Sequence, residues 1–571
     1  MLGTLPNTTL EFMNWSWSQI EPVYAELLAR PIDASNIETW LADWTQLIRL
    51  ISETNNRLEI ATTVNTEDQE AVTRLQNFMV NVAEPASIQE QKMKEKLLRS
   101  ELAPIGFENA MRNIQTEAEI FREANVPLVT KERELAIQYN KVVGAQSVVW
   151  EGQELTITQL KLKLQSDDRS LREAVWKAIA ERRLADRPAL NELWTKYLPL
   201  REQMAKNAGY DNFRDLRWKQ FKRFDYTPDD CLTFHAAIEK VVVPAATRIY
   251  EHQRQKLGVD TLRPWDLDRD DVYPPSRPPL HPFNNVEELV SKTDTILHKV
   301  DPELGDYFSI MRKEGLLDLD NRKGKGPGGY QAGLVQSKRP FIFMNAVGTQ
   351  DDVQTLLHES GHAFHLFEAL KLPYSQQWEY TSEIAEVASM SMELLAAPYL
   401  KASEGGFYTP QEAARAEIEH LEQNILFWPF MAVVDAFQHW VYSNPQLAID
   451  PANCDAKWGE LWARFIPGVD WSGLEDSRVT GWHRKLHIFQ IPFYYVDYGL
   501  AQIGAMQVWR NSMTDKAKAI HDYRAALALG DTKPLPELFA AAGAKFAFDA
   551  GTLGELVDLS EKRIHELEQV K

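Results

Sequence analysis

The sequence predicts a large, mainly α-helical protein with one small antiparallel β-sheet, and three observations indicate this fold class. Residues from about 10 to 140 carry apolar side chains at helical spacing almost without a break. The spacing resumes from 160 to 209, where Lys, Arg and Glu four residues apart are typical of solvated helix faces. Strand patterns stand out at 147–157, which predicts a small hairpin turning at Glu151 and Gly152, and at 340–345, PFIFMN.

The composition is that of a folded protein that binds neither nucleic acid nor membranes. Hydrophobic residues make up 44% and charged residues 25% of the 571 positions, as in ordinary globular proteins. The net charge of −20, with no concentrated basic tract, opposes binding to phosphate backbones. The longest apolar run, 426–434, is too short to span a bilayer, and residues 1–17 lack the features of a signal peptide. We therefore expect a cytoplasmic protein.

A metal-binding motif lies in the stretch 349–370, which also has the pattern of a helix. Thr349 is suited to be its N-cap, with Asp352 three residues on. His358, Glu359 and His362 spell H-E-x-x-H. Residues four apart on a helix share a face, so the two imidazoles can bind one tetrahedral zinc. Glu359 can then reach a water in the open position of the metal.

A catalytic zinc needs a third protein ligand, and two patterns compete for it. The metzincin pattern requires Gly and His where this sequence has His365 and Glu368, so it fails. The alternative is a glutamate from a following helix. The run 380–395 supplies three acids close to one helical face: Glu383, Glu386 and Glu393. The residues alone leave open which of these is the ligand, and an exposed acidic face remains an alternative.

HESGHAFH followed by EIAEVASMSME resembles the thimet oligopeptidase and oligoendopeptidase F family of zinc peptidases. The resemblance extends from about residue 325 to 504. It implies that Glu386 is the third ligand, that Glu393 supports a ligand histidine, and that each chain holds one Zn²⁺. It also implies a mostly helical fold with the active site in a deep channel between two helical halves. Residues 1–320 would form one wall of the channel, and 321–571 would be the catalytic region.

A second group of candidate residues lies in 487–502, HIFQIPFYYVDYGLAQ. An aromatic core is the default interpretation of such a run, but His487, Tyr494, Tyr495 and Tyr498 also offer several donors within twelve residues. Amide hydrolysis needs donors aimed at a developing oxyanion. The family resemblance implies that this histidine and these tyrosines act on the substrate carbonyl. We favour Tyr498 as the oxyanion donor, with Tyr495 and His487 supporting it.

Other prominent features predict structural roles. The run 324–333, GKGPGGYQAG, lacks the order of a phosphate-binding loop and predicts a flexible loop, with movement over the active site as one option. The strand at 340–345 leaves two options open: an edge that pairs with an extended peptide, or an internal strand. His365 is expected to contact the core or support a ligand. Further residues are expected to be structural histidines or ordinary buried or partly buried thiols: His420, His439, His483, Cys231 and Cys454.

Together these features predict a zinc metallo-oligoendopeptidase, a hydrolase that cleaves internal bonds of short unstructured peptides through a zinc-bound water activated by Glu359. A peptidyl-dipeptidase of the same fold is an alternative. A non-catalytic protein that binds zinc or peptides is an alternative of another class, although zinc binding alone does not need Glu359. The ligand set also suits cobalt or manganese. Monomer and homodimer both remain open.

Overall fold

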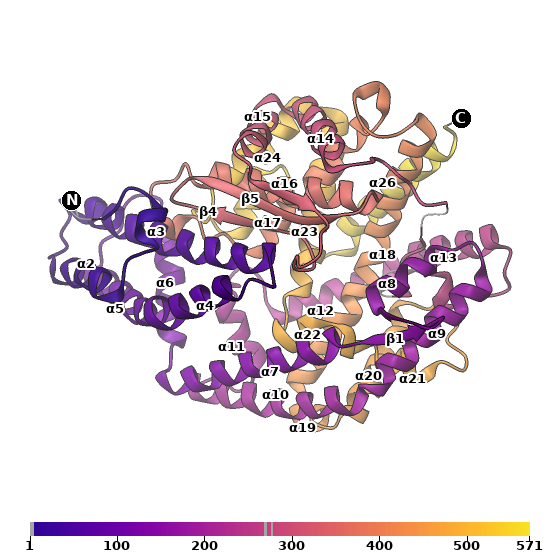
Figure 1. Cartoon of the computed structure of the whole chain (residues 1–571), viewed down its shortest axis with the longest axis horizontal. Helices are drawn as coiled ribbons and strands as arrows, with labels where there is room; N and C mark the ends of the chain where they lie inside the picture. The colour runs from indigo at the N-terminus through magenta and orange to yellow at the C-terminus, as the bar shows by residue number, and fades with distance from the viewer. Residues whose placement is uncertain (1–4, 268–270, 276–277, 571) are drawn as a thin grey trace. The chain divides into compact units, whose positions relative to one another are not determined.

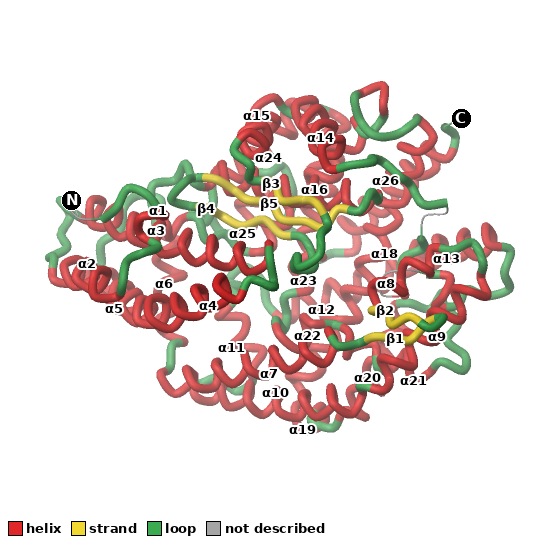
Figure 2. The backbone as a smooth tube through the Cα atoms, in the orientation of Figure 1, coloured by secondary structure: helices red, strands yellow, loops and turns green. Residues whose placement is uncertain are grey.

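The computed structural model describes residues 5–267, 271–275 and 278–570. Helices dominate it, and within these residues the strands form two small sheets (Figures 1 and 2). The mainly α-helical fold class is therefore confirmed. None of the described helices combines the length and the apolarity needed to cross a membrane.

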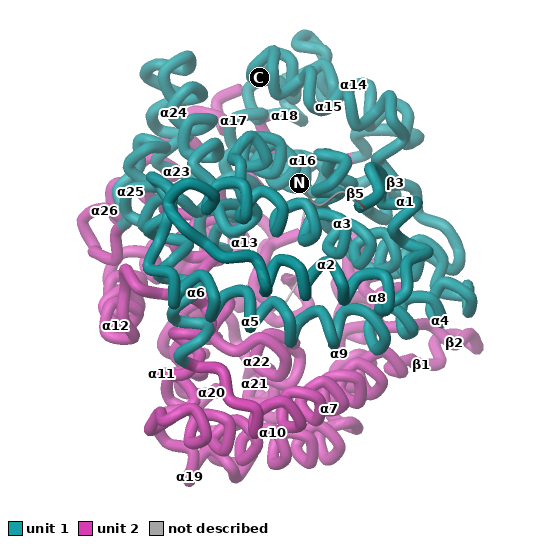
Figure 3. Tube along the Cα trace, turned by 90° about the vertical axis from the view of Figure 1, so that its left-hand side faces the viewer, with its two compact units in different colours: residues 1–119, 281–413, 504–546 teal, residues 120–280, 414–503, 547–571 magenta. Residues whose placement is uncertain are grey.

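The chain forms two compact units, and each is assembled from three separated segments (Figure 3). Unit 1 comprises residues 1–119, 281–413 and 504–546, and unit 2 comprises 120–280, 414–503 and 547–571. The division predicted from the sequence, between 1–320 and 321–571, does not coincide with these units. The physical reason is that helices far apart in sequence pack together, so that the last helix of the chain packs against residues 228–242.

Unit 1 contains the H-E-x-x-H helix and the larger sheet. Its helices are α1 (Thr9–Phe12), α2 (Trp17–Ala29), α3 (Ile37–Val64), α4 (Gln69–Phe78), α5 (Glu84–Ser100), α6 (Glu108–Ile120), α14 (Val286–Val300), α15 (Pro302–Lys313), α16 (Gln350–Ala369), α17 (Ser382–Ala396), α24 (Lys516–Ala528) and α25 (Leu535–Ala541). Helix α16 packs against α17 on one side and against the sheet on another.

The sheet of unit 1 has the strand order β3 (Leu317–Asp320), β5 (Arg339–Ala346), β4 (Tyr330–Leu334). The strand predicted at 340–345 is confirmed as β5. It is the internal strand, paired on both sides, so the interpretation of this strand as a free edge is wrong. The sheet is mixed and not wholly antiparallel. A tight turn makes β4 antiparallel to β5, whereas β3 lies on the far side of β5 and runs parallel to it.

The glycine-rich run predicted to be a flexible loop is partly a strand, since β4 begins at Tyr330. The residues before it are held by hydrogen bonds. The Gly326 N–H donates to the Thr63 carbonyl at 2.7 Å, and the buried ammonium of Lys325 donates to the backbone carbonyl of Asp318 at 2.9 Å. Lys325 also lies 3.0 Å from the Asp318 carboxylate. The lysine thus ties the loop to β3.

Unit 2 contains the small hairpin and the remaining helices. The hairpin of β1 (Ser147–Trp150) and β2 (Gln153–Thr156) is confirmed, and its turn residues Glu151 and Gly152 both have positive φ, as a tight two-residue turn requires. The helices of unit 2 are α7 (Val126–Gly144), α8 (Ile157–Lys161), α9 (Arg169–Ala185), α10 (Arg187–Ala208), α11 (Phe213–Gln220), α12 (Pro228–Ala237), α13 (Val243–Leu257), α19 (Pro445–Ala448), α20 (Pro451–Phe465), α21 (Glu475–Val479), α22 (Leu486–Gln490) and α26 (Ala550–Glu568). Most of α18 (Pro410–Ser443) also belongs here, and α23 (Tyr495–Thr514) crosses the division at residue 504.

Candidate metal centre and active site

Helix α16 begins where the sequence predicts. The Thr349 side chain caps it by accepting a hydrogen bond from the Asp352 N–H at 3.4 Å. The Asp352 carboxylate accepts hydrogen bonds from the backbone N–H groups of Val347, Gly348 and Thr349 at 2.9, 2.8 and 2.8 Å. Because Val347 directly follows β5, this carboxylate fixes the turn from the sheet into the helix.

The structure brings His358, His362 and Glu386 into one group, with the glutamate supplied by α17. The Glu386 Oε2 lies 3.3 Å from His358 Nε2 and 3.6 Å from His362 Nε2. Two ligands that share a tetrahedral zinc, each about 2.1 Å from the metal, are about 3.4 Å apart. The ligand atoms of all three residues lie within 4.8 Å of one another. Their spacing therefore fits one zinc-sized ion.

Each of the three side chains has a partner that orients it. His358 Nδ1 lies 2.6 Å from Glu393 Oε1, and the His362 ring hydrogen-bonds to the backbone of Ala385. The Ser389 hydroxyl donates to Glu386 Oε2 at 2.9 Å. Bonds of this kind to the far nitrogen of a histidine are characteristic of metal ligands, because they fix the tautomer and turn Nε2 toward the ion.

Glu359 is 7% exposed and lies beside this group. Its carboxylate accepts a hydrogen bond from the backbone of Gln331 on β4. Burial raises the pKa of Glu359 to about 7, and burial lowers the pKa of His362 to about 4. A carboxylate that exchanges a proton near neutral pH is suited to general acid–base chemistry.

Gly361, between the two histidines, lets α16 and α17 approach closely. A Cβ atom at this position would lie 2.5 Å from the Ala388 carbonyl oxygen and 2.5 Å from Ser389 Cα. Both atoms belong to the backbone of α17 and cannot move without shifting the helix. The glycine therefore holds Glu386 within reach of the histidines.

Gly361→Ala is expected to destabilise the protein by about 1–3 kcal/mol, the usual cost of overpacking, although alanine favours helices over glycine. Zinc affinity is expected to fall as well, because α17 carries Glu386. Urea unfolding and zinc content measure the two effects. Gly144→Ala, in α7, is the matched control, since no atom lies within 4 Å of the added Cβ. Equal stability of the two variants would contradict the packing argument.

The other candidates near the motif take different positions. The buried His365 ring stacks on Tyr380 at 3.5 Å between ring centroids, a core contact. Glu383 is also buried, but it is not part of the group of three. Of the three acids that the sequence offers as the third ligand, Glu386 and Glu393 therefore lie beside the histidines.

In unit 2 the structure brings the candidates of the aromatic run together. The His487 ring lies 4.9 Å from the Tyr495 ring and 6.2 Å from the Tyr498 ring, measured between centroids. Tyr495 and Tyr498 are 5.7 Å apart, and Tyr494 is 5.2 Å from Tyr498. These side chains therefore form one polar aromatic cluster at the start of α23.

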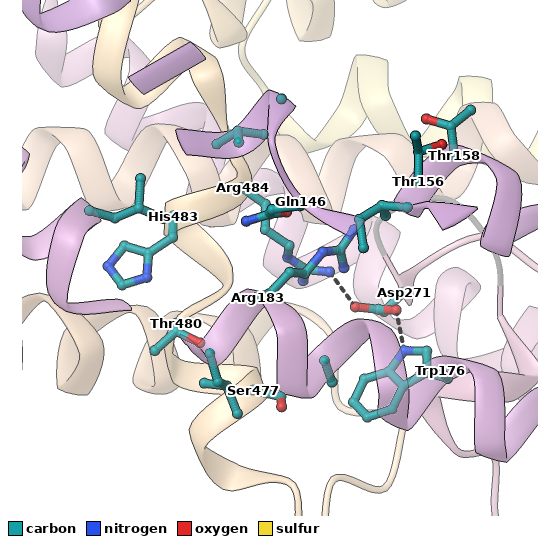
Figure 4. Close-up of a pocket in the computed structure, with 16 residues that line it drawn as sticks. Gln146, Thr156, Thr158, Trp176, Arg183, Asp271, Ser477, Thr480, His483 and Arg484 are labelled. Atoms are coloured by element: carbon teal, nitrogen blue, oxygen red, sulfur yellow. Dashed lines mark hydrogen bonds and ion pairs between the residues drawn. The ribbon is translucent and has the colours of Figure 1, made fainter. Parts of the chain in front are cut away.

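Unit 2 also contains a cavity of about 430 Å³, shown in Figure 4. Asp271 at its wall accepts hydrogen bonds from the Trp176 indole at 2.7 Å and from Arg484 at 2.6 Å. His483, predicted from the sequence to be structural, also lines the cavity and lies 2.8 Å from the Asn191 side-chain oxygen. The histidines, glutamates and tyrosines predicted to be functional do not line this cavity.

Two contacts were not predicted from the sequence. They are the hydrogen bond from the Ser389 hydroxyl to Glu386 and the one from the Gln331 backbone to Glu359. Ser389 lies three residues after Glu386, one helical turn away, and this spacing is the one sequence signal for it. Gln331 acts through its backbone, so no side-chain pattern marks it.

Known proteins resemble this chain over much of its length. The model of peptidase family M3 matches residues 162–557. The chromosomal oligoendopeptidase F of Lactococcus lactis subsp. cremoris is 25% identical over 421 residues, which cover 68% of this chain and 65% of that protein. The oligopeptidase PepF of Bacillus subtilis (strain 168) is 23% identical over 445 residues, which cover 75% of this chain and 64% of that protein. The chain spans about two thirds of the length of these two curated relatives and a smaller share of others that it matches.

A solved structure, PZ peptidase A with an inhibitor, has a TM-score of 0.86 at 26% identity and covers 99% of this chain and 98% of that one. The family resemblance seen in the sequence motifs is thereby confirmed. Since the family model covers more than half of the residues, the chain belongs to peptidase family M3, a family of metallopeptidases.

Proposed function

We propose that this protein is a zinc metallo-oligoendopeptidase that hydrolyses internal bonds of short peptides. The observation that carries the proposal is the group of His358, His362 and Glu386 with the buried carboxylate of Glu359 beside it. Membership of peptidase family M3 supports the reaction class. Short, unstructured peptides as substrates and an active site that excludes folded proteins remain predictions from the resemblance.

The three residues fit zinc by chemistry as well as by spacing. Two imidazoles and one carboxylate are a ligand set of catalytic zinc sites, in which a fourth position stays open. Although burial opposes it, the neighbouring His362 and His358 hold the pKa of Glu386 below its ordinary value, so the carboxylate is kept ionised as a ligand must be. When bound, zinc supplies Lewis acidity to the attacking water and to the scissile carbonyl.

The protein groups then move the protons. Glu359 takes a proton from the attacking water on its carboxylate and delivers it to the amine that leaves. The Gln331 backbone holds the carboxylate in place during both transfers. Tyr498 is proposed to donate a hydrogen bond to the oxygen of the scissile carbonyl as negative charge develops there, with Tyr495 and His487 supporting it.

Tyr498→Phe is expected to lower kcat/KM by about 10²- to 10³-fold, the usual effect of removing one oxyanion donor, while zinc stays bound. Tyr494→Phe is the matched control, because its ring lies in the same cluster. Steady-state kinetics on one fluorogenic peptide compare the two variants. A larger loss in Tyr494→Phe would give the role to Tyr494 instead.

The function is tested with a set of quenched peptides of about ten residues, with products identified by mass spectrometry. Cleavage at internal bonds is the expected result. Release of C-terminal dipeptides alone would keep the mechanism and change the class to peptidyl-dipeptidase. Zinc binding without cleavage of any peptide would overturn the proposal in favour of a binding protein.

A further inference from the structure

A second group of potential metal ligands is buried in unit 2, on α12 and α18. Cys231 and His235 lie four residues apart on α12, and Asp435 and His439 lie four residues apart on α18. All four are between 0% and 3% exposed. The ligand atoms of Cys231, Asp435 and His439 lie within 4.8 Å of one another. Among the described residues, this group and the His358 group are the two with such spacing.

Hydrogen bonds within the protein do not satisfy this cluster. His235 Nε2 lies 2.8 Å from Asp435 Oδ2, which accounts for one carboxylate oxygen. Asp435 Oδ1 and His439 Nδ1 are buried without a hydrogen-bond partner among the described protein atoms, and His439 Nε2 has only a long contact, 3.3 Å from Asp435 Oδ2. Leaving a buried polar group unsatisfied is destabilising. A bound cation would satisfy the carboxylate of Asp435 and one ring nitrogen of His439 together.

The geometry matches that of the first group. His439 Nε2 lies 3.3 Å from Asp435 Oδ2, and His358 Nε2 lies 3.3 Å from Glu386 Oε2. In both places a carboxylate and an imidazole are at the separation of two ligands on one tetrahedral ion, about 3.4 Å. In both places another side chain, His235 here and Glu393 there, hydrogen-bonds to a member of the group.

The charges also favour a divalent cation. Burial alone raises the pKa of Cys231, but with a divalent ion bound its thiolate and the Asp435 carboxylate would carry two negative charges that the ion neutralises. Burying a neutral set costs far less than burying an isolated carboxylate. The rings of Trp218 and Phe493 lie 5.7 and 5.2 Å from that of His439, while the charges of Arg223 and Asp497 also act on Cys231. Sulfur, nitrogen and oxygen ligands together favour zinc over magnesium or calcium.

We propose that Cys231, Asp435 and His439 bind a second Zn²⁺, which joins α12 to α18 inside unit 2. His235 is a positioning residue that holds the Asp435 carboxylate. The site has a structural role, because its three ligands are buried and Asp435 Oδ1, which has no hydrogen-bond partner among the described protein atoms, is available as the fourth donor. The proposed site differs from two predictions made from the sequence, one zinc per chain and an ordinary thiol at Cys231, and it agrees with a structural role for His439.

The test is the zinc content of protein produced with excess zinc, measured by elemental analysis and by native mass spectrometry. Two zinc ions per chain are expected for the wild type and one for Cys231→Ser. Cys454→Ser is the matched control, because Cys454 is also a buried free cysteine but belongs to neither group. It is expected to keep two. One zinc in both the wild type and Cys231→Ser would overturn the proposal.

Cobalt gives a second measurement on the intact wild-type protein, which decides the matter even if Cys231→Ser fails to fold. Co²⁺ bound to Cys231 is expected to show a sulfur-to-cobalt charge-transfer band. The band reports on this site alone, because the His358 group contains no sulfur. The band must persist in Cys454→Ser. Absence of the band from the wild type, or its loss in Cys454→Ser, would overturn the proposal.

The inference is independent of the proposed catalytic zinc. His358→Gln is expected to remove one zinc and all peptide hydrolysis while leaving the cobalt band intact. His235→Gln is expected to keep the band but release zinc to a chelator about 10- to 100-fold more readily, the usual effect of losing a group behind a ligand. If His235→Gln released zinc to the chelator at the wild-type rate, the positioning role of His235 would be overturned. Loss of the cobalt charge-transfer band from Cys231→Ser, with peptide hydrolysis retained, would support the site.

Discussion

Glu359→Gln is expected to lower kcat for peptide hydrolysis by about 10²- to 10⁴-fold while the zinc content of the His358 group stays the same. The amide has nearly the shape of the carboxylate, but it cannot accept a proton from water, so the general-base contribution is lost. The neighbouring ligands keep their positions because Glu359 is not one of the three. Single-turnover kinetics and elemental analysis on the same sample measure both quantities.

Glu368→Gln is the control for this variant. It makes the same chemical change on the same helix, where the Glu368 carboxylate pairs with Lys371 at 2.6 Å and with Arg524 at 3.0 Å. This variant is expected to lose thermal stability and to keep its turnover. Substantial turnover in Glu359→Gln would show that Glu359 is not the general base. Loss of zinc from this variant would show instead that Glu359 helps to hold the metal site together.

Glu386→Gln is expected to weaken zinc binding by more than about 10²-fold and to abolish hydrolysis at low zinc. The substitution removes the one anionic ligand from a group of two imidazoles and a carboxylate. Its effect should exceed the 10- to 100-fold typical of the groups that orient ligands. Competition with a chromogenic chelator measures the affinity, and activity is followed as zinc is added back.

Two neighbouring glutamates serve as comparisons. Glu393→Gln is expected to weaken zinc binding by about 10- to 100-fold, because its carboxylate contacts His358 Nδ1. Glu383→Gln is expected to leave the affinity unchanged, since Glu383 is not in the group of three. The loss of zinc affinity is thus expected to be largest at Glu386, smaller at Glu393 and absent at Glu383. This ranking tests which of the three acids is the third ligand. A larger effect at Glu383 would contradict the assignment of the third ligand.

Short-range patterns in the sequence determined the local parts of the site. The H-E-x-x-H spacing, the cap at Thr349 and the strand at 340–345 depend on neighbours within a few residues, and such interactions act in the same way wherever the segment folds. The hairpin is also determined by neighbouring residues, because its two-residue turn depends on Glu151 and Gly152. The motif was also specific enough to indicate the family that the comparisons confirm.

The tertiary structure decided what depends on residues far apart in the chain. The choice of Glu386 and Glu393 over Glu383 depends on how α17 packs on α16, which Gly361 permits through one missing side chain. Whether β3 forms a parallel or an antiparallel pair depends on whether it lies beside β5 or beside β4, and no local pattern records that.

The buried cluster of Cys231, Asp435 and His439 is the clearest case. In the sequence, two ordinary helices about 200 residues apart each carry a pair of polar residues on one face, and neither pair resembles a motif. Packing alone makes them a candidate site, because it places the two pairs against each other and removes water from both. Spacing within a helix can be read from sequence, whereas the pairing of two distant helix faces is a property of the folded chain.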